Sequence, residues 1–277
     1  MNITLKNKTL EVEIDAFGAE LKSIQYNDIE YLWQGDPEYW KRNSPVLFPI
    51  VGRLLDDEYI YEDKTYKLTQ HGFARDMQFE LLESSDNKVL FLLRENETSL
   101  QRYPFTFNLF IGYEVIDNRI VVTWKVENTN DKEMYFQIGA HPAFNFLNGS
   151  YIDINKVTNQ YLLEGTPYVQ DITANIKYDS IEIDNTTFTK DAIVVDNIDY
   201  ITLRDDTKSV SIHCNNFPFL GLWTKLIDNE NAPFICLEPW HGIADFSFHD
   251  KQLVTKKGIN ILQKGEIFNA TYYIELK

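Results

Sequence analysis

Four polar side chains stand where an apolar or glycine-marked segment of the sequence ends. They are Arg53 in LFPIVGRL, His71 in LTQHGFAR, His141 in IGAHPAF and Glu238 in FICLEPWHG. A carboxylate and an imidazole with pKa values near neutrality are sufficient for general acid–base catalysis. An exposed arginine and hydrogen-bonded structural histidines would leave the same pattern. Taken one by one, these residues therefore indicate a site without proving one.

The local surroundings of Glu238 and His141 are compatible with a catalytic role, although a structural role is the commoner one for such residues. Glu238 follows the apolar run APFICL and precedes Pro239 and Trp240, so we expect its carboxylate to be partly desolvated. Desolvation raises a carboxyl pKa towards neutrality, which suits a general base. Pro142 favours extended backbone at His141 and ends the strand there, presenting the imidazole at a strand end. The alternative for Glu238 is a residue that caps a loop or pairs with a lysine.

The elements that position these residues are strands, because the apolar pattern has a period of two almost throughout. TLEVEI (9–14), YFQIGA (135–140), SVSIHC (209–214) and FLGLWTKL (219–226) are examples, and residues 105–128 predict a hairpin that turns at Asp117–Asn118. Only residues 36–42 and 98–103 suggest short helices. The pattern predicts an all-β fold, a large antiparallel β-sandwich or barrel with few helices, as a single domain over residues 1–277.

Composition excludes several classes of function. The formal charge of −16 argues against nucleic acid and anionic membranes as partners. We found no apolar run of about 18 residues, no phosphate-binding loop, no dinucleotide fingerprint and no paired metal-binding cysteines. Cys214 and Cys236 lie in apolar strand-like segments, which favours buried free thiols and a cytoplasmic protein.

The order of the motifs resembles that of a known family. GR at 52–53, HGF at 71–73, GAHPAFN at 139–145 and LEPW at 237–240 resemble the aldose 1-epimerases, the galactose mutarotase-like proteins. The likeness is greatest to the bacterial branch associated with lactose and tagatose pathway genes. AFGAELKSI, YLW, SPVLFPIVGRL and WTK at 223–225 extend it over nearly the whole chain. HPAFNF and EPWHG depart from the HTYFNL and EPQ of the best-known mutarotases, so the resemblance implies the chemistry but not the identity of the sugar.

The resemblance implies a galactose mutarotase-like β-sandwich and a role for each matching residue. Glu238 is implied to be the base that takes the anomeric proton, and His141 the acid that protonates the ring oxygen. His71 and Arg53 are implied to bind the sugar. An aspartate is also expected, Asp191 rather than the neighbouring Asp196.

Other residues complete the expected sugar site, which needs no metal and no cofactor. Trp240, Phe73 and Trp223 offer rings to the apolar face of a sugar, and Lys225 is a further binding residue. The expected activity is the interconversion of the α and β anomers of a hexose. The expected partner is that hexose alone, acted on by a monomer or a homodimer.

Three alternatives stay open from the sequence. A noncatalytic carbohydrate-binding protein on the same fold would use the aromatic residues and Arg53 but would not need an acid and a base together. A hexose 6-phosphate 1-epimerase would need cations near C6, for which Arg75 and Lys225 are available. A metal hydrolase would use His71, His141 and Glu238 as ligands.

Overall fold

The computed structural model describes residues 1–154, 156–178 and 180–277. Strands make up most of its regular structure, and the helical segments are short. These segments are α1 (Glu97–Arg102) and three 3-10 turns, η1 (Leu55–Asp57), η2 (Ala74–Asp76) and η3 (Leu253–Thr255). Within the described ranges, no helix has the length and apolar character needed to cross a membrane.

The largest sheet has nine antiparallel strands. Their order is β18 (Ile181–Glu182), β15 (Tyr151–Asp153), β20 (Tyr200–Arg204), β21 (Ser209–His213), β27 (Ile267–Leu276), β11 (Arg119–Asn128), β10 (Phe107–Ile116), β9 (Lys88–Arg94) and β8 (Glu80–Ser84). β10 and β11 meet at a tight turn in which Asp117 has a φ of +52°. The hairpin expected at Asp117–Asn118 is therefore confirmed.

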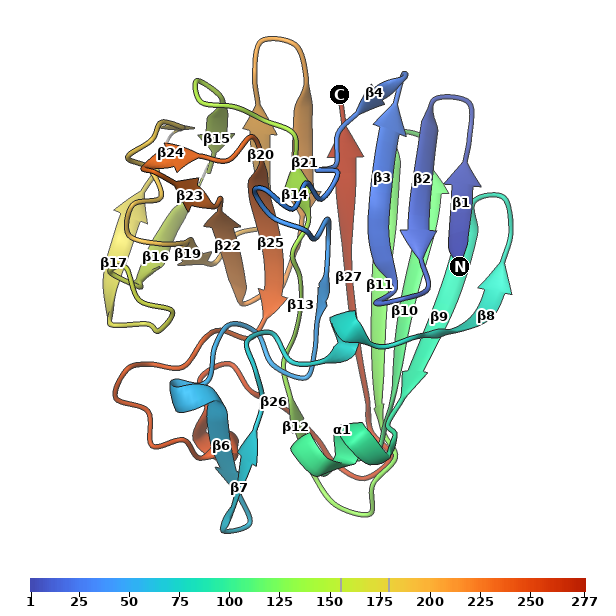
Figure 1. Cartoon of the computed structure of the whole chain (residues 1–277), viewed down its shortest axis with the longest axis vertical. Coiled ribbons are helices and arrows are strands. Elements are labelled where there is room, and N and C mark those ends of the chain that lie inside the picture. The colour runs from blue at the N-terminus through green and yellow to red at the C-terminus, as the bar shows by residue number, and fades with distance from the viewer. Residues whose placement is uncertain (155, 179) are drawn as a thin grey trace.

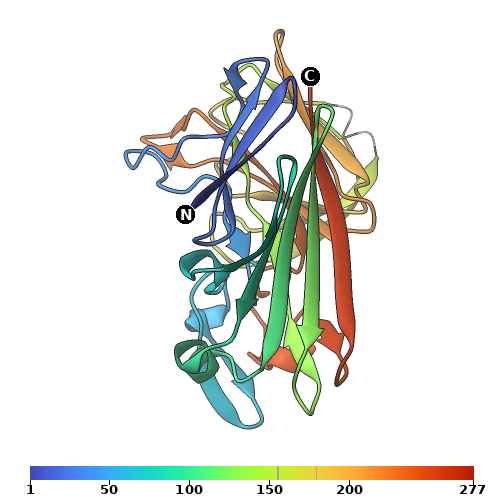
Figure 2. The ribbon, with the colours of Figure 1, turned by 90° about the vertical axis from the view of Figure 1, so that its right-hand side faces the viewer.

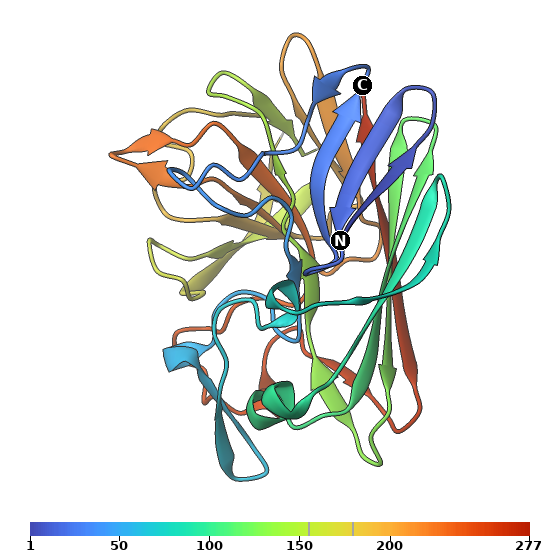
Figure 3. The same ribbon diagram turned by 45° about the vertical axis from the view of Figure 1, so that its right-hand side comes forward.

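A four-stranded sheet packs against one face of this large sheet. It consists of β1 (Asn2–Lys6), β2 (Leu10–Asp15), β3 (Glu20–Tyr26) and β4 (Ile29–Glu30). Alternate residues of β2, namely Leu10, Val12 and Ile14, are fully buried between the layers. The Tyr113 hydroxyl on β10 donates to the Ala19 carbonyl oxygen at 2.7 Å and joins the two layers. Figures 2 and 3 show these blue strands as a layer separate from the green and red strands.

A second large sheet carries the residues with chemical interest. Its order is β17 (Asp171–Lys177), β16 (Val157–Leu162), β19 (Ile193–Asp196), β22 (Phe219–Trp223), β25 (Ile235–His241), β13 (Ile138–Ala140) and β5 (Val46–Leu47), with β14 (Ala143–Phe144) also paired to β25. Three two-stranded pairs complete the fold: β6 (Glu58–Tyr61) with β7 (Lys64–Lys67), β12 (Met134–Phe136) with β26 (Asn260–Leu262), and β23 (Leu226–Ile227) with β24 (Glu230–Asn231). Figure 1 shows β22, β25 and β13 side by side. The expected large antiparallel β-sandwich is confirmed.

β25 separates the main core from the site. Leu237 joins the large core cluster together with Leu222 of β22 and Ile274 of β27. Because successive side chains of a strand point to opposite faces, Glu238 and Trp240 point away from that core. Trp240 belongs to a smaller apolar cluster, with Leu47 among its members. Within LEPW, Leu237 thus points into the main core, whereas Glu238 and Trp240 point to the opposite face of the same buried strand.

The two expected helices have different outcomes. α1 confirms the short helix expected at 98–103, with bounds one residue earlier, and it begins with a reciprocal cap, in which Asn96 and Ser99 satisfy each other's backbone N–H groups. Residues 36–42 form a turn instead of a helix. Two N–H groups, those of Tyr39 and Trp40, close this turn on the Asp36 carbonyl oxygen. The carbonyl oxygen of Trp40 then accepts from the Trp33 indole at 2.8 Å, which directs the chain away from a helical path.

Candidate active site

A cavity of about 440 Å³ lies on the outer face of β22 and β25. Its volume falls within the range of roughly 300–1,000 Å³ that is usual for pockets that bind small molecules. Its lining combines residues of the second large sheet with residues of loops, and includes Trp40, Arg42, Gly52, Gln70, His71, Arg75, His141, Asp191, Trp223, Glu238, Trp240 and Ala244.

The strand register places His141 opposite Glu238. In the antiparallel pairing with β25, Gly139 faces Trp240 and Ala143 faces Cys236, so the position midway between them falls opposite Glu238. That position is His141, whose Nε2 lies 3.2 Å from the Glu238 Oε2. The two side chains are therefore held at the spacing of neighbouring strands rather than by a loop.

Burial sets the charge of this pair. It raises the pKa of Glu238 well above its usual range, and the nearby Asp191 carboxylate adds to the rise. Burial also lowers the pKa of His141 to about 3, with Arg75 and then Arg42 contributing. Both shifts favour the uncharged forms, a protonated carboxyl beside a neutral imidazole. Transfer of one proton between them gives the carboxylate and the imidazolium.

His71 is held as a neutral hydrogen-bond donor. Its Nδ1 accepts the Gly52 N–H at 3.1 Å, and its own backbone N–H donates to the Gly52 carbonyl oxygen at 2.9 Å. Because Nδ1 accepts, the ring proton of the neutral form is on Nε2. Burial lowers the pKa of His71 well below its usual value, and the neighbouring His141 lowers it further. The two imidazole rings meet edge to face with their centres 5.4 Å apart.

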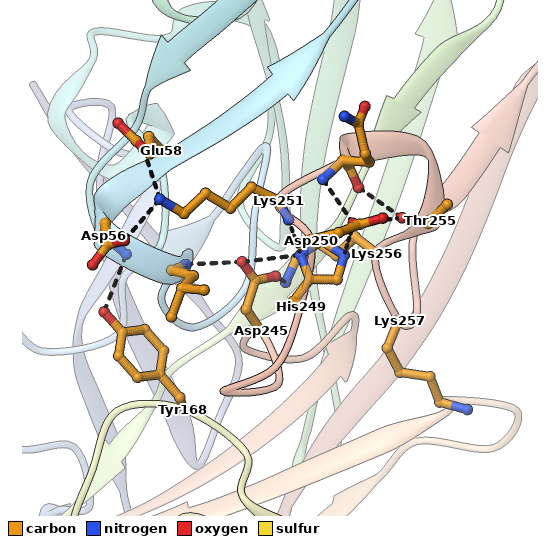
Figure 4. Close-up of polar contacts among 12 residues, drawn as sticks. Asp56, Glu58, Tyr168, Asp245, His249, Asp250, Lys251, Thr255, Lys256 and Lys257 are labelled. Carbon is orange, nitrogen blue, oxygen red and sulfur yellow. Dashed lines mark hydrogen bonds and ion pairs between the residues drawn. The ribbon is translucent and has the colours of Figure 1, made fainter.

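A buried ion pair supports the turn at Gly52, and Figure 4 shows its two members, Asp245 and Lys256. Asp245 donates its backbone N–H to the Arg53 carbonyl oxygen, and its Oδ2 accepts the Leu55 N–H at 2.8 Å. Its Oδ1 lies 2.6 Å from Lys256 Nζ. Gly52 has a φ of +71°, and a Cβ there would lie 2.6 Å from the Cβ of Ala244. Only glycine therefore fits, and the pair Asp245–Lys256 supports the turn that orients His71.

Asp191 reaches the cavity, whereas Asp196 does not line it. Asp191 has a φ of +74°, and its Oδ1 accepts the Ala192 N–H at 2.8 Å. Burial raises its pKa. Asp196 instead binds the backbone N–H and the side-chain amide of Asn159, both at 2.9 Å, and the hydroxyl of Tyr161 at 3.1 Å.

Three indole rings border the cavity. The ring of Trp240 lies over the two strands that flank β25. A Cβ at Gly221 of β22 would lie 2.5 Å from Cη2 of this ring, and a Cβ at Gly139 of β13 would lie 2.6 Å from its Cδ1. Trp223 contacts His141 edge to face at 5.6 Å. Trp40 also packs against the His141 ring, with centres 4.9 Å apart, and it contacts Trp223 at 5.8 Å. Sequence reasoning missed Trp40, because it lies in a turn far from every motif.

Two arginines form the positively charged side of the cavity. Arg75 donates through Nη2 to the Gln70 carbonyl oxygen at 2.7 Å, and its buried Nε has no hydrogen-bond partner among the described residues. Burial, followed by the effect of Arg42, lowers the pKa of Arg75 to about 10. Arg42 is paired with Asp76 at 2.9 Å. Sequence reasoning had named Arg75 only for a phosphate, and it had missed Arg42.

Three of the expected binding residues lie outside the cavity lining. The Arg53 guanidinium is engaged by Asp57, with Nε 2.8 Å and Nη2 2.7 Å from the two carboxylate oxygens. Phe73 is buried in the main core, where its ring packs against Phe48, Tyr103 and Phe107. Lys225 donates to the Tyr39 carbonyl oxygen at 2.6 Å. Local partners, namely a carboxylate, the core and a carbonyl, hold these side chains away from the site.

Within the described residues, one group of three metal-ligating side chains has its ligand atoms close together, namely His141, Cys236 and Glu238. His71, which the metal hydrolase alternative requires, is not part of this group. Its Nδ1 is occupied by the Gly52 N–H.

Known proteins are similar to this chain over nearly its whole length. The chain is 34% identical over 285 residues to the chromosomal LacX protein of Lactococcus lactis subsp. lactis, covering 92% of this chain and 94% of that protein. The crystal structure of a galactose mutarotase related enzyme from Lactobacillus acidophilus matches with a TM-score of 0.96 and 32% identity, over 100% of this chain and 97% of that one. A galactose mutarotase-like protein from Lactobacillus casei matches with a TM-score of 0.94 and 29% identity, over 100% of both chains.

The match to a family model covers almost the whole chain. Residues 1–272 fit the model described as aldose 1-epimerase. This stretch contains every residue of the cavity described above. The chain therefore belongs to the aldose 1-epimerase family.

Proposed function

We propose that this protein is an aldose 1-epimerase that interconverts the α and β anomers of a free hexose. The observation that carries the proposal is the pair Glu238–His141, a carboxyl and an imidazole 3.2 Å apart in a cavity of about 440 Å³. The anomeric hydroxyl and the ring oxygen of a pyranose are bonded to the same carbon. A base and an acid on neighbouring strands can therefore reach both oxygens at once.

The pair shares one proton and passes it through the reaction. With that proton on His141, the Glu238 carboxylate takes the proton of the anomeric hydroxyl while His141 protonates the ring oxygen. The C1–ring oxygen bond breaks, C1 becomes an aldehyde, and the pair is left as protonated Glu238 and neutral His141. Rotation about C1–C2 followed by the reverse transfers closes the ring on the other face.

The surrounding residues fit a polyhydroxylated ligand. Besides the facing pair His141–Glu238, three buried side-chain atoms of the cavity have no hydrogen-bond partner among the described residues: Arg75 Nε, His141 Nδ1 and Trp240 Nε1. Unpaired buried polar atoms are costly, and a ligand rich in hydroxyl groups would satisfy both donors and acceptors. His71 supplies a further neutral donor. The indole faces of Trp223 and Trp240 suit the C–H face of a sugar.

The test is polarimetry on freshly dissolved α-glucose and α-galactose, with the uncatalysed rate subtracted. Glu238→Gln keeps the size of the side chain but cannot take a proton, so kcat should fall about 10²–10⁴-fold with little change in KM. Glu30→Gln is the control for loss of a glutamate that binds backbone N–H groups away from the cavity. The double variant with His141→Asn should lose far less than the product of the two single losses, because acid and base act together.

A normal rate in folded Glu238→Gln protein would leave the noncatalytic binding protein as the better explanation. That alternative explains the aromatic lining but gives no role to a buried acid and base side by side.

One observation favours a second candidate, a hexose 6-phosphate as substrate. Arg75 and Arg42 both line the cavity, and an arginine fork suits a phosphate group. Lys225 does not contribute, since its Nζ is bound to the Tyr39 carbonyl oxygen. If this candidate is right, kcat/KM for glucose 6-phosphate should exceed that for glucose, and Arg42→Gln should abolish the difference. Equal or lower values for the phosphate would support the free hexose.

A further inference from the structure

Cys236 lies beside the proposed acid–base pair and has no role in the chemistry described so far. It precedes Glu238 by two residues on β25, so both side chains project from the same face of the strand. Its partners across the sheet are Ala143 on one side and Trp223 on the other. The thiol is free and fully buried.

The ligand atoms of His141, Cys236 and Glu238 lie within 4.8 Å of one another. In a tetrahedral zinc site the bond lengths of about 2.0–2.3 Å place neighbouring ligand atoms roughly 3.3–3.8 Å apart. The His141 Nε2 and Glu238 Oε2 are already at 3.2 Å. Small rotations of side chains would thus bring the three atoms to coordination distance, without movement of the strands.

The two ligand atoms of His141 and Glu238 are buried and face each other. Glu238 Oε2 makes no hydrogen bond among the described residues, and the polar atom near it is the His141 Nε2 that would bind the same cation. His141 and Glu238 both line the cavity, so a fourth ligand could be water or a sugar hydroxyl. Three protein ligands and one open position make up the usual donor set of an accessible zinc site.

We propose that Zn²⁺, or a similar thiophilic divalent cation, binds to His141, Cys236 and Glu238 and inhibits the protein. An imidazole and a thiolate select Zn²⁺ and Cd²⁺ over Mg²⁺ and Ca²⁺, which prefer oxygen ligands alone. The positive charges of Arg42 and Arg75 are both offset by Asp76, whose carboxylate lies 2.9 Å from Arg42 Nη2 and 3.8 Å from Arg75 Nε. The bound cation occupies the carboxylate and the imidazole that must exchange protons with the sugar. Inhibition rests on the proposed function, whereas binding does not.

The binding test uses metal alone. The purified, metal-free protein is titrated with CoCl₂ and CdCl₂, which give ultraviolet thiolate-to-metal absorption bands when sulfur is a ligand. The wild type should bind one equivalent and show the band. Cys236→Ser and Cys236→Ala should lose it, whereas Cys214→Ser, which changes the other buried free cysteine, should keep it. Absence of the band from the wild type, or its persistence without Cys236, would overturn the proposal.

The inhibition test adds ZnCl₂ to the polarimetric assay, and each variant is compared with its own zinc-free rate. We expect the wild type and Cys214→Ser to be inhibited and to recover fully with EDTA. Loss of one ligand should raise the inhibitory zinc concentration of Cys236→Ser at least about tenfold, by analogy with losses at supporting positions of metal sites. Inhibition of Cys236→Ser at the wild-type concentration would refute the site. If the wild type had no epimerase activity, the absorption bands alone would decide the binding claim.

Discussion

The buried pair Lys256–Asp245 gives the sharpest test of how the cavity is supported. Lys256 Nζ lies 2.6 Å from Asp245 Oδ1 and 2.8 Å from the Ile243 carbonyl oxygen, and both side chains are about 1% exposed. Lys256→Met keeps much of the length of the side chain and removes its charge. The carboxylate of Asp245 then keeps only the Leu55 N–H and His249, whose Nδ1 is 3.6 Å away.

Removal of one partner of a buried ion pair costs about 3–5 kcal/mol, because the other charge stays buried without compensation. The remaining contacts of Asp245 favour the low end, about 3 kcal/mol. For a domain of this size, that loss lowers Tm by roughly 6–12 °C. The double variant Asp245→Asn with Lys256→Met should be more stable than Lys256→Met alone, because it no longer buries an unpaired charge.

Lys256→Met should also change the activity, because it disturbs the position of His71. Asp245 positions the chain around Gly52, and Gly52 holds the His71 ring, whereas Glu238 lies on β25 and His141 lies between β13 and β14. We therefore expect Lys256→Met to raise KM more than it lowers kcat, measured by polarimetry well below the Tm of both proteins. Differential scanning calorimetry measures the stability.

Lys251→Met is the matched control. Figure 4 shows Lys251 between Asp56 and Glu58, with its Nζ 2.7 Å from each carboxylate, but its side chain is 22% exposed. A solvent-exposed pair of this kind contributes much less to stability than a buried one, because water screens it. Equal losses of Tm in Lys251→Met and Lys256→Met, or a double variant less stable than Lys256→Met, would refute this account of the network.

Three further predictions concern the same site and its support. Gly221→Ala should force the Trp240 ring to move, at a cost of about 1–3 kcal/mol in stability and with a higher KM, because its Cβ would lie 2.5 Å from Cη2. Calorimetry and polarimetry would contradict this if both were unchanged. Burial raises the pKa of Asp245, but His249 and Lys256 outweigh it and hold the pKa at about 2, below the ordinary 3.8. Its stabilisation of about 2 kcal/mol is therefore complete above about pH 4 and lost as the pH falls through about 2. Urea unfolding over this range should show the loss, which Asp245→Asn should lack. Activity should survive exhaustive EDTA treatment, and a loss that zinc restores would favour a metal-dependent hydrolase instead.

Much of the fold and the centre of the site were predictable from the sequence. The period of two in the strands predicted the sandwich, because a half-buried strand needs alternating side chains. His141, His71 and Glu238 each lie in a short motif, so each residue could be identified from its immediate neighbours in the sequence. All three line one cavity.

The remaining binding residues depend on contacts that no short motif encodes. Trp40 and Arg42 reach the cavity because the turn at 36–42 is tied to Trp33 and Asp76. Arg53 follows Gly52 directly, yet its side chain turns to Asp57 while only Gly52 lines the cavity. Adjacency in sequence predicted the right segment here, but not the direction of the side chain.

The pairing of β25 with β13 and β14 also determines when the site can form during folding. His141 and Glu238 are nearly a hundred residues apart in the chain, so they meet only after a long loop has closed. Pairings of this kind are slow, because the chain loses the entropy of a large loop before it gains the contacts. Local hairpins such as β10–β11 are closed by a two-residue turn and can form much earlier. A refolding chain would therefore regain its local hairpins while still inactive, and the proposed activity would return only after such long-range pairings have formed.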